Sequence, residues 1–307
     1  MKKPQGSITM SVFTLAKNAA SCIERMLASA FPWATEFVMV DDASTDDTAE
    51  IASHWCRTHG LTFVHVRISP ETHPGLYRVD EPATYEHLGD GSCPGPFTVR
   101  PLLVDFAGAR NEGWSRVTSS WALVLDADDT VQNREAIPVD VGGAISCGAT
   151  RIQGRYDVAG RTGGARGLIF RMDAAGRWQG RIHEHLPHPP STRVGTLRVL
   201  DHRDNAGTDV RIPNHYLKVA WLSCQEAGWW GANPHDLGCL VLDLNGERHE
   251  SASGALAMFR QVCPADVELR TYVEAELRRR QEPEIERSSE GQRRHGDEPG
   301  NQSQEQP

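Results

Sequence analysis

The chain has 307 residues, of which 39% are hydrophobic and 24% charged, with a formal net charge of −9. This length allows one large or two modest domains, and the ordinary composition, with no long apolar run, predicts a protein without a membrane span. The negative charge makes nucleic-acid binding a minority hypothesis, although a local basic patch could still meet an anionic ligand. The candidate patch is Arg151, Arg155, Arg161, Arg166 and Arg171.

The first half alternates short apolar runs with amphipathic helical patterns, as in βαβ units with a largely parallel sheet. Strands are expected at residues 8–13, 37–40, 61–66 and 121–125. Helices are expected at residues 19–27, at 49–55 with an end at Gly60, and at 106–117. Asn18 is the expected N-cap of the first helix.

The second half is expected to complete the sheet and then to become helical. The predicted strands are residues 144–158, 167–171, 178–183 and 194–200, and the predicted helices 216–227, 235–244 and 251–262. Residues 69–99 show little periodicity and are interpreted as a mobile or functional loop. The predicted organisation is an α/β domain over 1–210, a helical appendage over 211–282 that resembles part of a tetratricopeptide repeat, and a disordered tail over 283–307.

The termini and cysteines suggest a location. The basic start, with Lys2 and Lys3, leads into a strand-like segment instead of an apolar signal core. Seven scattered cysteines form no CxxC pair and are typical of reduced thiols. We therefore expect a cytoplasmic protein.

Acidic residues follow two of the predicted parallel strands. Asp41 and Asp42 end the second strand, and Asp126 and Asp128 follow the fourth. Open α/β sheets bind ligands at this edge, and oxygen ligands suit Mg²⁺ or Mn²⁺ bridging a diphosphate. The alternative for an isolated DxD is a solvated turn with capping aspartates.

Four segments favour a metal and diphosphate site over a solvated turn: residues 11–18 (SVFTLAKN), 36–48 (EFVMVDDASTDDT), 106–113 (FAGARNEG) and 121–129 (WALVLDADD). In this order they resemble the opening of family 2 glycosyltransferases of the GT-A fold, over roughly residues 8–132. The resemblance implies a Rossmann-like mixed sheet flanked by helices. It also implies transfer of a sugar from a UDP- or GDP-sugar to an acceptor hydroxyl with inversion, helped by Mn²⁺ or Mg²⁺.

The resemblance also assigns residues. Asp42 matches the aspartate that contacts the nucleobase or ribose, Asp128 is the expected direct metal ligand, and Arg110 and Asn111 match a pair that faces the donor. The nucleotide-sugar site implied is Thr14, Lys17, Asn18, Asp41, Asp42, Arg110, Asn111 and Asp126, and the metal site Asp126, Asp128 and His183. The acceptor stays open: a glycan, a lipid-linked glycan, a protein, a small molecule or, as the lesser alternative, a modified nucleic acid.

Residues 168–171 followed by 180–184 resemble a subgroup that carries an "HE" segment, here His183 and Glu184. Glu184 is the expected general base, and its alternative is an exposed glutamate beside a buried histidine. The acidic pair that many inverting members carry after the DxD is absent, which weakens this assignment, and residues 69–99 have no family counterpart. The histidine spacing does not match a zinc signature.

Two rival functions remain. A sugar nucleotidyltransferase would show a Gly-rich phosphate loop after the first strand, and residues 14–18 contain none. A catalytically silent scaffold with the same fold would not need Asp42, Asp126 and Asp128. The sequence therefore favours the transferase.

Overall fold

The computed structural model describes residues 9–79, 101–158, 161–181, 184–186, 191–202, 241, 256–257, 259–260 and 268–281. None of the helices within these ranges is long and apolar enough to span a membrane. The predicted helices 216–227 and 235–244, most of 251–262, and the tail over 283–307 lie outside the described residues. The helix α8 (Glu268–Gln281) falls inside the predicted appendage.

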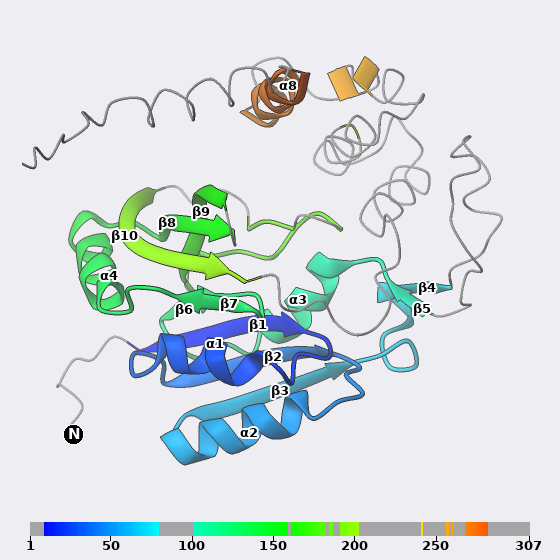
Figure 1. Cartoon of the computed structure of the whole chain (residues 1–307), viewed down its shortest axis with the longest axis vertical. Helices are drawn as coiled ribbons and strands as arrows, with labels where there is room; N and C mark the ends of the chain where they lie inside the picture. Colours follow the sequence, from blue (N-terminus) through cyan, green and yellow to red (C-terminus); the bar gives the residue numbers. More distant parts are fainter. Residues whose placement is uncertain are drawn as a thin grey trace, which may run out of the picture.

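An eight-stranded mixed sheet forms the centre of the fold, in the order β3-β2-β1-β6-β9-β8-β10-β7 (Figure 1). Strands β1, β2, β3 and β6 are parallel, β9 is antiparallel to β6 and β8, and β10 is parallel to β8. Their bounds are β1 (Met10–Ala16), β2 (Glu36–Asp42), β3 (Thr62–Ile68), β6 (Trp121–Val124), β7 (Asp129–Val131), β8 (Arg151–Val158), β9 (Arg161–Arg171) and β10 (Thr192–Asp201). The predicted GT-A-type α/β architecture is confirmed.

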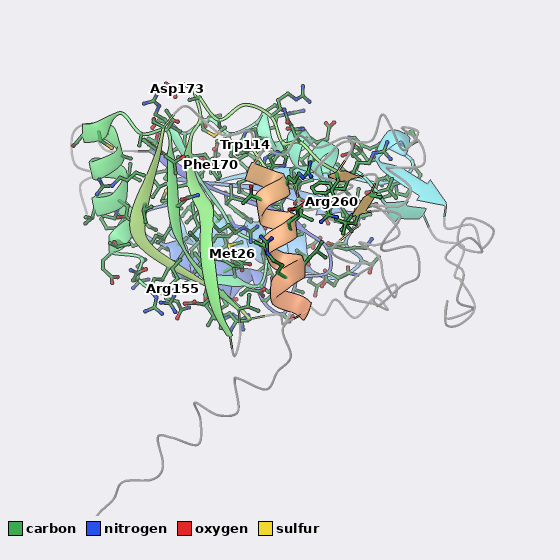
Figure 2. All side chains as sticks on the ribbon, turned by 90° about the horizontal axis from the view of Figure 1, so that it is seen from above. Met26, Trp114, Arg155, Phe170, Asp173 and Arg260 are labelled. Carbon is green, nitrogen blue, oxygen red and sulfur yellow. The ribbon has the colours of Figure 1, made fainter. Side chains whose placement is uncertain are left out.

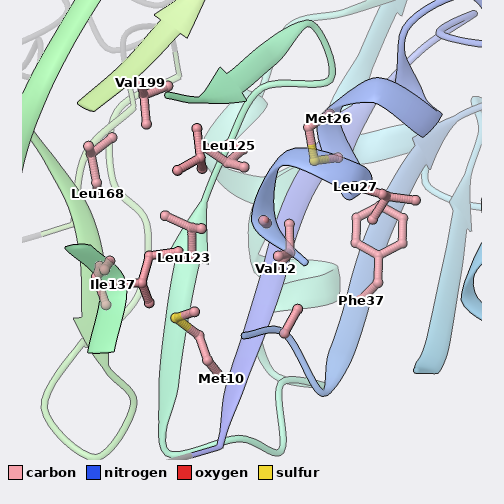
Figure 3. Packing of buried hydrophobic residues seen from close by; sticks show 14 of the residues in the cluster. Met10, Val12, Met26, Leu27, Phe37, Leu123, Leu125, Ile137, Leu168 and Val199 are labelled. Atoms are coloured by element: carbon pink, nitrogen blue, oxygen red, sulfur yellow. The ribbon is translucent and has the colours of Figure 1, made fainter. Parts of the chain in front are cut away.

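Helices cover both faces of the sheet, so the parallel strands β1, β2 and β6 are buried on both sides. Residues of α1 (Ile23–Ala30), α2 (Thr48–His59) and α4 (Ala136–Cys147) pack in one core, shown in Figure 3. The other face packs against α3 (Phe106–Trp114), and in Figure 2 Trp114 lies near Phe170 of β9. The strand residues alternate between these two cores, so the parity of a position decides which face its side chain reaches.

The helix ends follow local chemistry. Asp105 caps α3, where its carboxylate accepts a hydrogen bond from the Gly108 N–H at 2.7 Å. Gly60 ends α2 in the left-handed conformation (φ 71°), as predicted. The prediction that Asn18 caps the first helix is wrong: α1 begins at Ile23, and the Asn18 side chain instead accepts from the Thr45 N–H.

Two predicted strands differ from the structure. Residues 136–147 form α4, so the predicted strand over 144–158 begins only at Arg151. The predicted strand over 178–183 is wrong within the residues described there, which show a single bridge between Gln179 and His185. Part of the predicted 69–99 loop is ordered, as a short 3₁₀ turn (Pro74–Leu76) and β4 (Tyr77–Val79), which pairs with β5 (Pro101–Leu103).

Helix α3 approaches the sheet closely at Gly113, where an added Cβ would lie 2.4 Å from Val40 Cγ2. We expect Gly113→Ala to lower the free energy of unfolding by about 1–2 kcal/mol, because overpacking outweighs the better helix propensity of alanine. Gly142→Ala on α4 is the matched control, since its Cβ would meet nothing within 4 Å. Urea unfolding should therefore show opposite signs for the two variants, and stabilisation by both would contradict the close approach.

Candidate active site

Asp41 and Asp42 point to opposite faces of the sheet. Both end β2, but Asp41 continues the side of Phe37 and Met39, and Asp42 that of Val38 and Val40. Their carboxylates therefore contact different residues, and the predicted shared role of Asp41 in nucleotide binding remains a prediction.

Asp42 lies on the α3 face, under the short strand β4. The Tyr77 hydroxyl donates to Asp42 Oδ1 at 2.5 Å, and Lys17 Nζ lies 3.2 Å from Oδ2. Burial, together with the hydrogen bond to Asp42, raises the pKa of Tyr77, which keeps its hydroxyl protonated as a donor. The structure thus brings the predicted residues Lys17 and Asp42 together.

Asp41 is fully buried on the α2 face. Its carboxylate accepts from the Ser44 N–H at 2.8 Å and lies 3.1 Å from His65 Nε2 and 3.2 Å from Arg67 Nη1. A pocket of about 810 Å³ adjoins it, lined by residues of β3, α2 and the turn before α2. This pocket lies on the face opposite to Asp42.

Two other predicted residues are engaged within the fold. The Thr14 side chain is buried, and its hydroxyl lies 3.5 Å from Leu15 O, which is a long contact. Asn18, in the left-handed region (φ 49°), binds the turn after β2 through Ser44 and Thr45. Asn18 therefore shapes the chain next to Lys17.

Arg110 connects the DxD turn with the predicted base. It is 5% exposed, and its Nε donates to Glu184 Oε1 at 2.5 Å while its Nη2 donates to Asp126 Oδ1 at 3.0 Å. The guanidinium lies 5.1 Å above the Trp178 ring. Burial lowers the pKa of Arg110, but Glu184 and Asp126 outweigh burial and raise it, so this buried cation stays charged.

The neighbouring Asn111 positions the segment that carries Glu184. Its side chain donates to Trp178 O at 3.0 Å and accepts from the Trp178 N–H at 2.9 Å. Both polar groups of the amide are therefore used within the chain, so its predicted contact with the donor stays a prediction.

Asp126 lies between two arginines. Arg110 contacts Oδ1, and both terminal nitrogens of Arg166 contact Oδ2 at 3.3 and 3.4 Å. Burial alone would raise the pKa of Asp126, but the charges of Arg166 and Arg110 hold it at about 2. Asp126 is therefore an anion neutralised by arginine in this structure.

Three carboxylates gather beside this pair. Asp128, Asp129 and Asp201 each offer an oxygen within 4.8 Å of the others. Asp201 lies next to the other two carboxylates because β10 pairs with β7 in a register that sets Asp201 opposite Asp129. An all-oxygen set of this kind fits Mg²⁺ or Mn²⁺. Asp128 was predicted as a ligand; Asp126 was too, but it lies outside this cluster.

Asp129 is almost completely buried, and it accepts from the Tyr156 hydroxyl at 2.9 Å and from the Asp126 N–H at 2.9 Å. Burial and the nearby charge of Asp126 raise the pKa of Asp129 to about 8. This carboxyl group therefore keeps its proton to a higher pH than an ordinary aspartate does.

Sequence reasoning missed several of these residues. Asp201 follows a predicted strand, and the strand-end rule that found Asp42 and Asp126 would have found it. Tyr77 lies in the stretch without periodicity, and Arg166 entered only as part of a diffuse basic patch, so neither carried a positional signal. The predicted metal ligand His183 lies outside the described residues.

The mixed sheet with carboxylates gathered along the carboxyl edge of its parallel strands defines the class, a GT-A-type α/β protein. Residues 11–78 match the model of glycosyl transferase family 2. The match confirms the predicted resemblance over these residues. It covers the first two of the four motif segments.

The chain also shows limited similarity to solved structures. S. aureus TarS is 16% identical, with 87% of this chain and 53% of that chain covered and a TM-score of 0.45. TarS 1–349 in complex with UDP-GlcNAc is 14% identical, with 92% of each chain covered and a TM-score of 0.44. Glucosyl-3-phosphoglycerate synthase from Mycobacterium tuberculosis, in complex with Mn²⁺, UDP and phosphoglyceric acid, is 21% identical, with 49% and 44% covered and a TM-score of 0.30.

This chain thus spans 53% of the length of the TarS structure. No curated protein matches the sequence. The function proposed next therefore rests on the family match and on the site residues.

Proposed function

We propose that the protein transfers a glycosyl group from a UDP- or GDP-sugar to an acceptor hydroxyl, with inversion and with the help of Mn²⁺ or Mg²⁺. The observation that carries the proposal is the Arg110 bridge, which places Glu184 beside the DxD turn. A base and a diphosphate site have to flank the same anomeric carbon, and the bridge puts candidates for both on one buried guanidinium.

Each residue has a role in this proposal. Asp42, with Tyr77 and Lys17 around it, accepts hydrogen bonds from the base or ribose of the donor. Glu184 removes the proton of the acceptor hydroxyl, and its second oxygen is the atom that receives it, since Oε1 is engaged by Arg110. Asp128 and Asp201, with Asp129, would hold the divalent cation, which supplies charge neutralisation for the departing nucleoside diphosphate.

We place this activity in the cytoplasm, because the scattered cysteines form neither a CxxC pair nor a disulfide-framework spacing. The acceptor belongs to one of the classes of hydroxyl compound considered above, and none of the described contacts selects among them.

The test is a screen of UDP-, GDP-, dTDP- and CMP-sugars with Mn²⁺ or Mg²⁺, read by thermal shift and by slow donor hydrolysis. We expect one donor class to stabilise the wild type in the presence of the cation, and Asp128→Ala to lose both the shift and the hydrolysis. Asp173→Ala, an exposed carboxylate on the surface, is the control and should behave as wild type. Absence of any response in the wild type would favour the silent scaffold instead.

A further inference from the structure

Arg166 differs from Arg110 in its exposure. It comes from β9, contacts the same carboxylate of Asp126, and keeps 40% of its side chain exposed, against 6% for Arg110. The guanidinium lies 4.5 Å above the Tyr156 ring. Arg166 is therefore a cation at the open side of the site, with one face fixed against an aromatic ring.

The ion pair of Arg166 is geometrically weak. Both terminal nitrogens share one oxygen, at 3.3 and 3.4 Å, whereas charge-assisted N–H···O bonds are usually about 2.7–2.9 Å. A carboxylate and a guanidinium at their best match form two parallel bonds to two oxygens, and here Arg110 already holds the other oxygen at 3.0 Å. The contact of Arg166 with Asp126 is therefore longer than that of Arg110, and it is the contact that another anion can replace.

The charges around Asp126 allow that exchange. Arg110 donates to Asp126 Oδ1 independently of Arg166, although it also donates to Glu184. When Arg166 moves away, Asp126 is left with a buried cation beside it. The Arg166 cation, which is half exposed, then has its full charge available for an anion that enters the site from solvent.

We propose that Arg166 exchanges Asp126 for the diphosphate of the nucleotide donor and so determines the affinity of the site for nucleoside diphosphates. This inference rests on the proposed function. The Asp128, Asp129 and Asp201 cluster is next to Arg166, because Tyr156, whose ring contacts the Arg166 guanidinium, donates its hydroxyl to Asp129. Planar guanidinium groups suit phosphate oxygens for the same reason that they suit carboxylates.

A purely structural role makes a different prediction. If Arg166 only fixed the Asp126 turn, its loss would disturb every ligand of the site equally. If Arg166 binds the diphosphate, its loss must depend on the number of phosphates in the ligand. Ligands that share one nucleoside but differ in phosphate count therefore separate the two roles.

The experiment measures Kd by titration calorimetry for uridine, UMP and UDP, and for guanosine, GMP and GDP, at a fixed Mn²⁺ concentration. The proteins are wild type, Arg166→Ala, Arg166→Lys and the control Arg171→Ala, an arginine of the same strand that pairs with Asp173 on the surface. Binding of Mn²⁺ alone is measured for each protein. Thermal unfolding checks the folding of each variant, and Arg166→Lys replaces the alanine variant if that one does not fold.

For whichever nucleotide the wild type binds, we expect Arg166→Ala to weaken diphosphate binding about tenfold or more, and monophosphate binding less. Binding of the nucleoside and of Mn²⁺ should stay within about twofold, and Arg171→Ala should match the wild type. The diphosphate affinity of Arg166→Lys should lie between those of wild type and Arg166→Ala, because a lysine keeps the charge without the planar guanidinium group. An equal loss for all three ligands, or no loss, would overturn the inference while leaving the proposed function in place. Failure of the wild type to bind either diphosphate would overturn both.

Discussion

Arg110→Ala is expected to lower the free energy of unfolding by about 3 kcal/mol or more, which is a large part of the stability of a typical domain. The variant loses the buried cation between Asp126 and Glu184 and its contact with the Trp178 ring. Asp126 keeps Arg166, so the cost falls mainly on Glu184, whose side chain is 12% exposed. Urea unfolding at pH 7 measures the difference.

The loss of stability in Arg110→Ala should also depend on pH, in a direction set by the pKa of Asp126. The depressed pKa of Asp126, about 2, stabilises the wild type fully above the ordinary value of 3.8, and this contribution is lost as the pH falls through 2. Arg110 supplies part of this depression and Arg166 another part, so the difference between wild type and Arg110→Ala should be larger above about pH 4 than in strong acid. Arg116→Ala, on the exposed surface just after α3, should change stability by less than about 0.5 kcal/mol. A small, pH-independent effect of Arg110→Ala would contradict the bridge.

The affinity for Mn²⁺ is expected to rise about tenfold for each pH unit between about pH 6 and 7, and to level off above pH 8. The cause is the Asp129 carboxyl group, whose pKa is raised to about 8 by burial and by Asp126. A raised carboxyl pKa stabilises the fold fully below 3.8, and this contribution is lost as the pH rises towards 8. The cation has to displace that proton, so proton and cation compete. Calorimetric titration at several pH values, without nucleotide, measures the slope.

Asp129→Asn is the diagnostic variant, since its amide is similar in size to the protonated carboxyl group but does not titrate. We expect weaker Mn²⁺ binding with a slope below about twofold per pH unit. An unchanged slope in this variant would assign the released proton to another group. Affinity independent of pH in the wild type would show that Asp129 is ionised before the cation arrives.

The parallel half of the fold was predictable because its signals agree with one another. Each predicted strand there is a short apolar run, and Gly60 supplies a helix stop that the structure confirms. Helix α4 was missed because Pro138, Gly142 and Gly143 lie inside it and weaken the helical pattern. Its buried residues, such as Ile137 and Val141, pack on the sheet and override that poor propensity.

The site was predictable only where a strand end locates a residue. Asp42 and Asp128 follow from that rule, as Asp201 would have done. The Arg110 bridge was not predictable, since Asp126 and Glu184 lie 58 positions apart in the sequence and meet only through the packing of α3. Asp41 was grouped with Asp42 because they are adjacent, although adjacent strand residues reach opposite faces.

Two neighbouring residues of α3 hold the segment with the proposed base: Asn111 fixes the backbone at Trp178, and Arg110 fixes Glu184 itself. A helix turns about 100° per residue. One residue inserted within α3 before Arg110 would therefore turn both side chains by about 100° relative to their partners without altering either of them. The number of residues between the Asp105 cap and Arg110 therefore matters as much as the two side chains, and chimeras that exchange α3 between related chains must keep it unchanged.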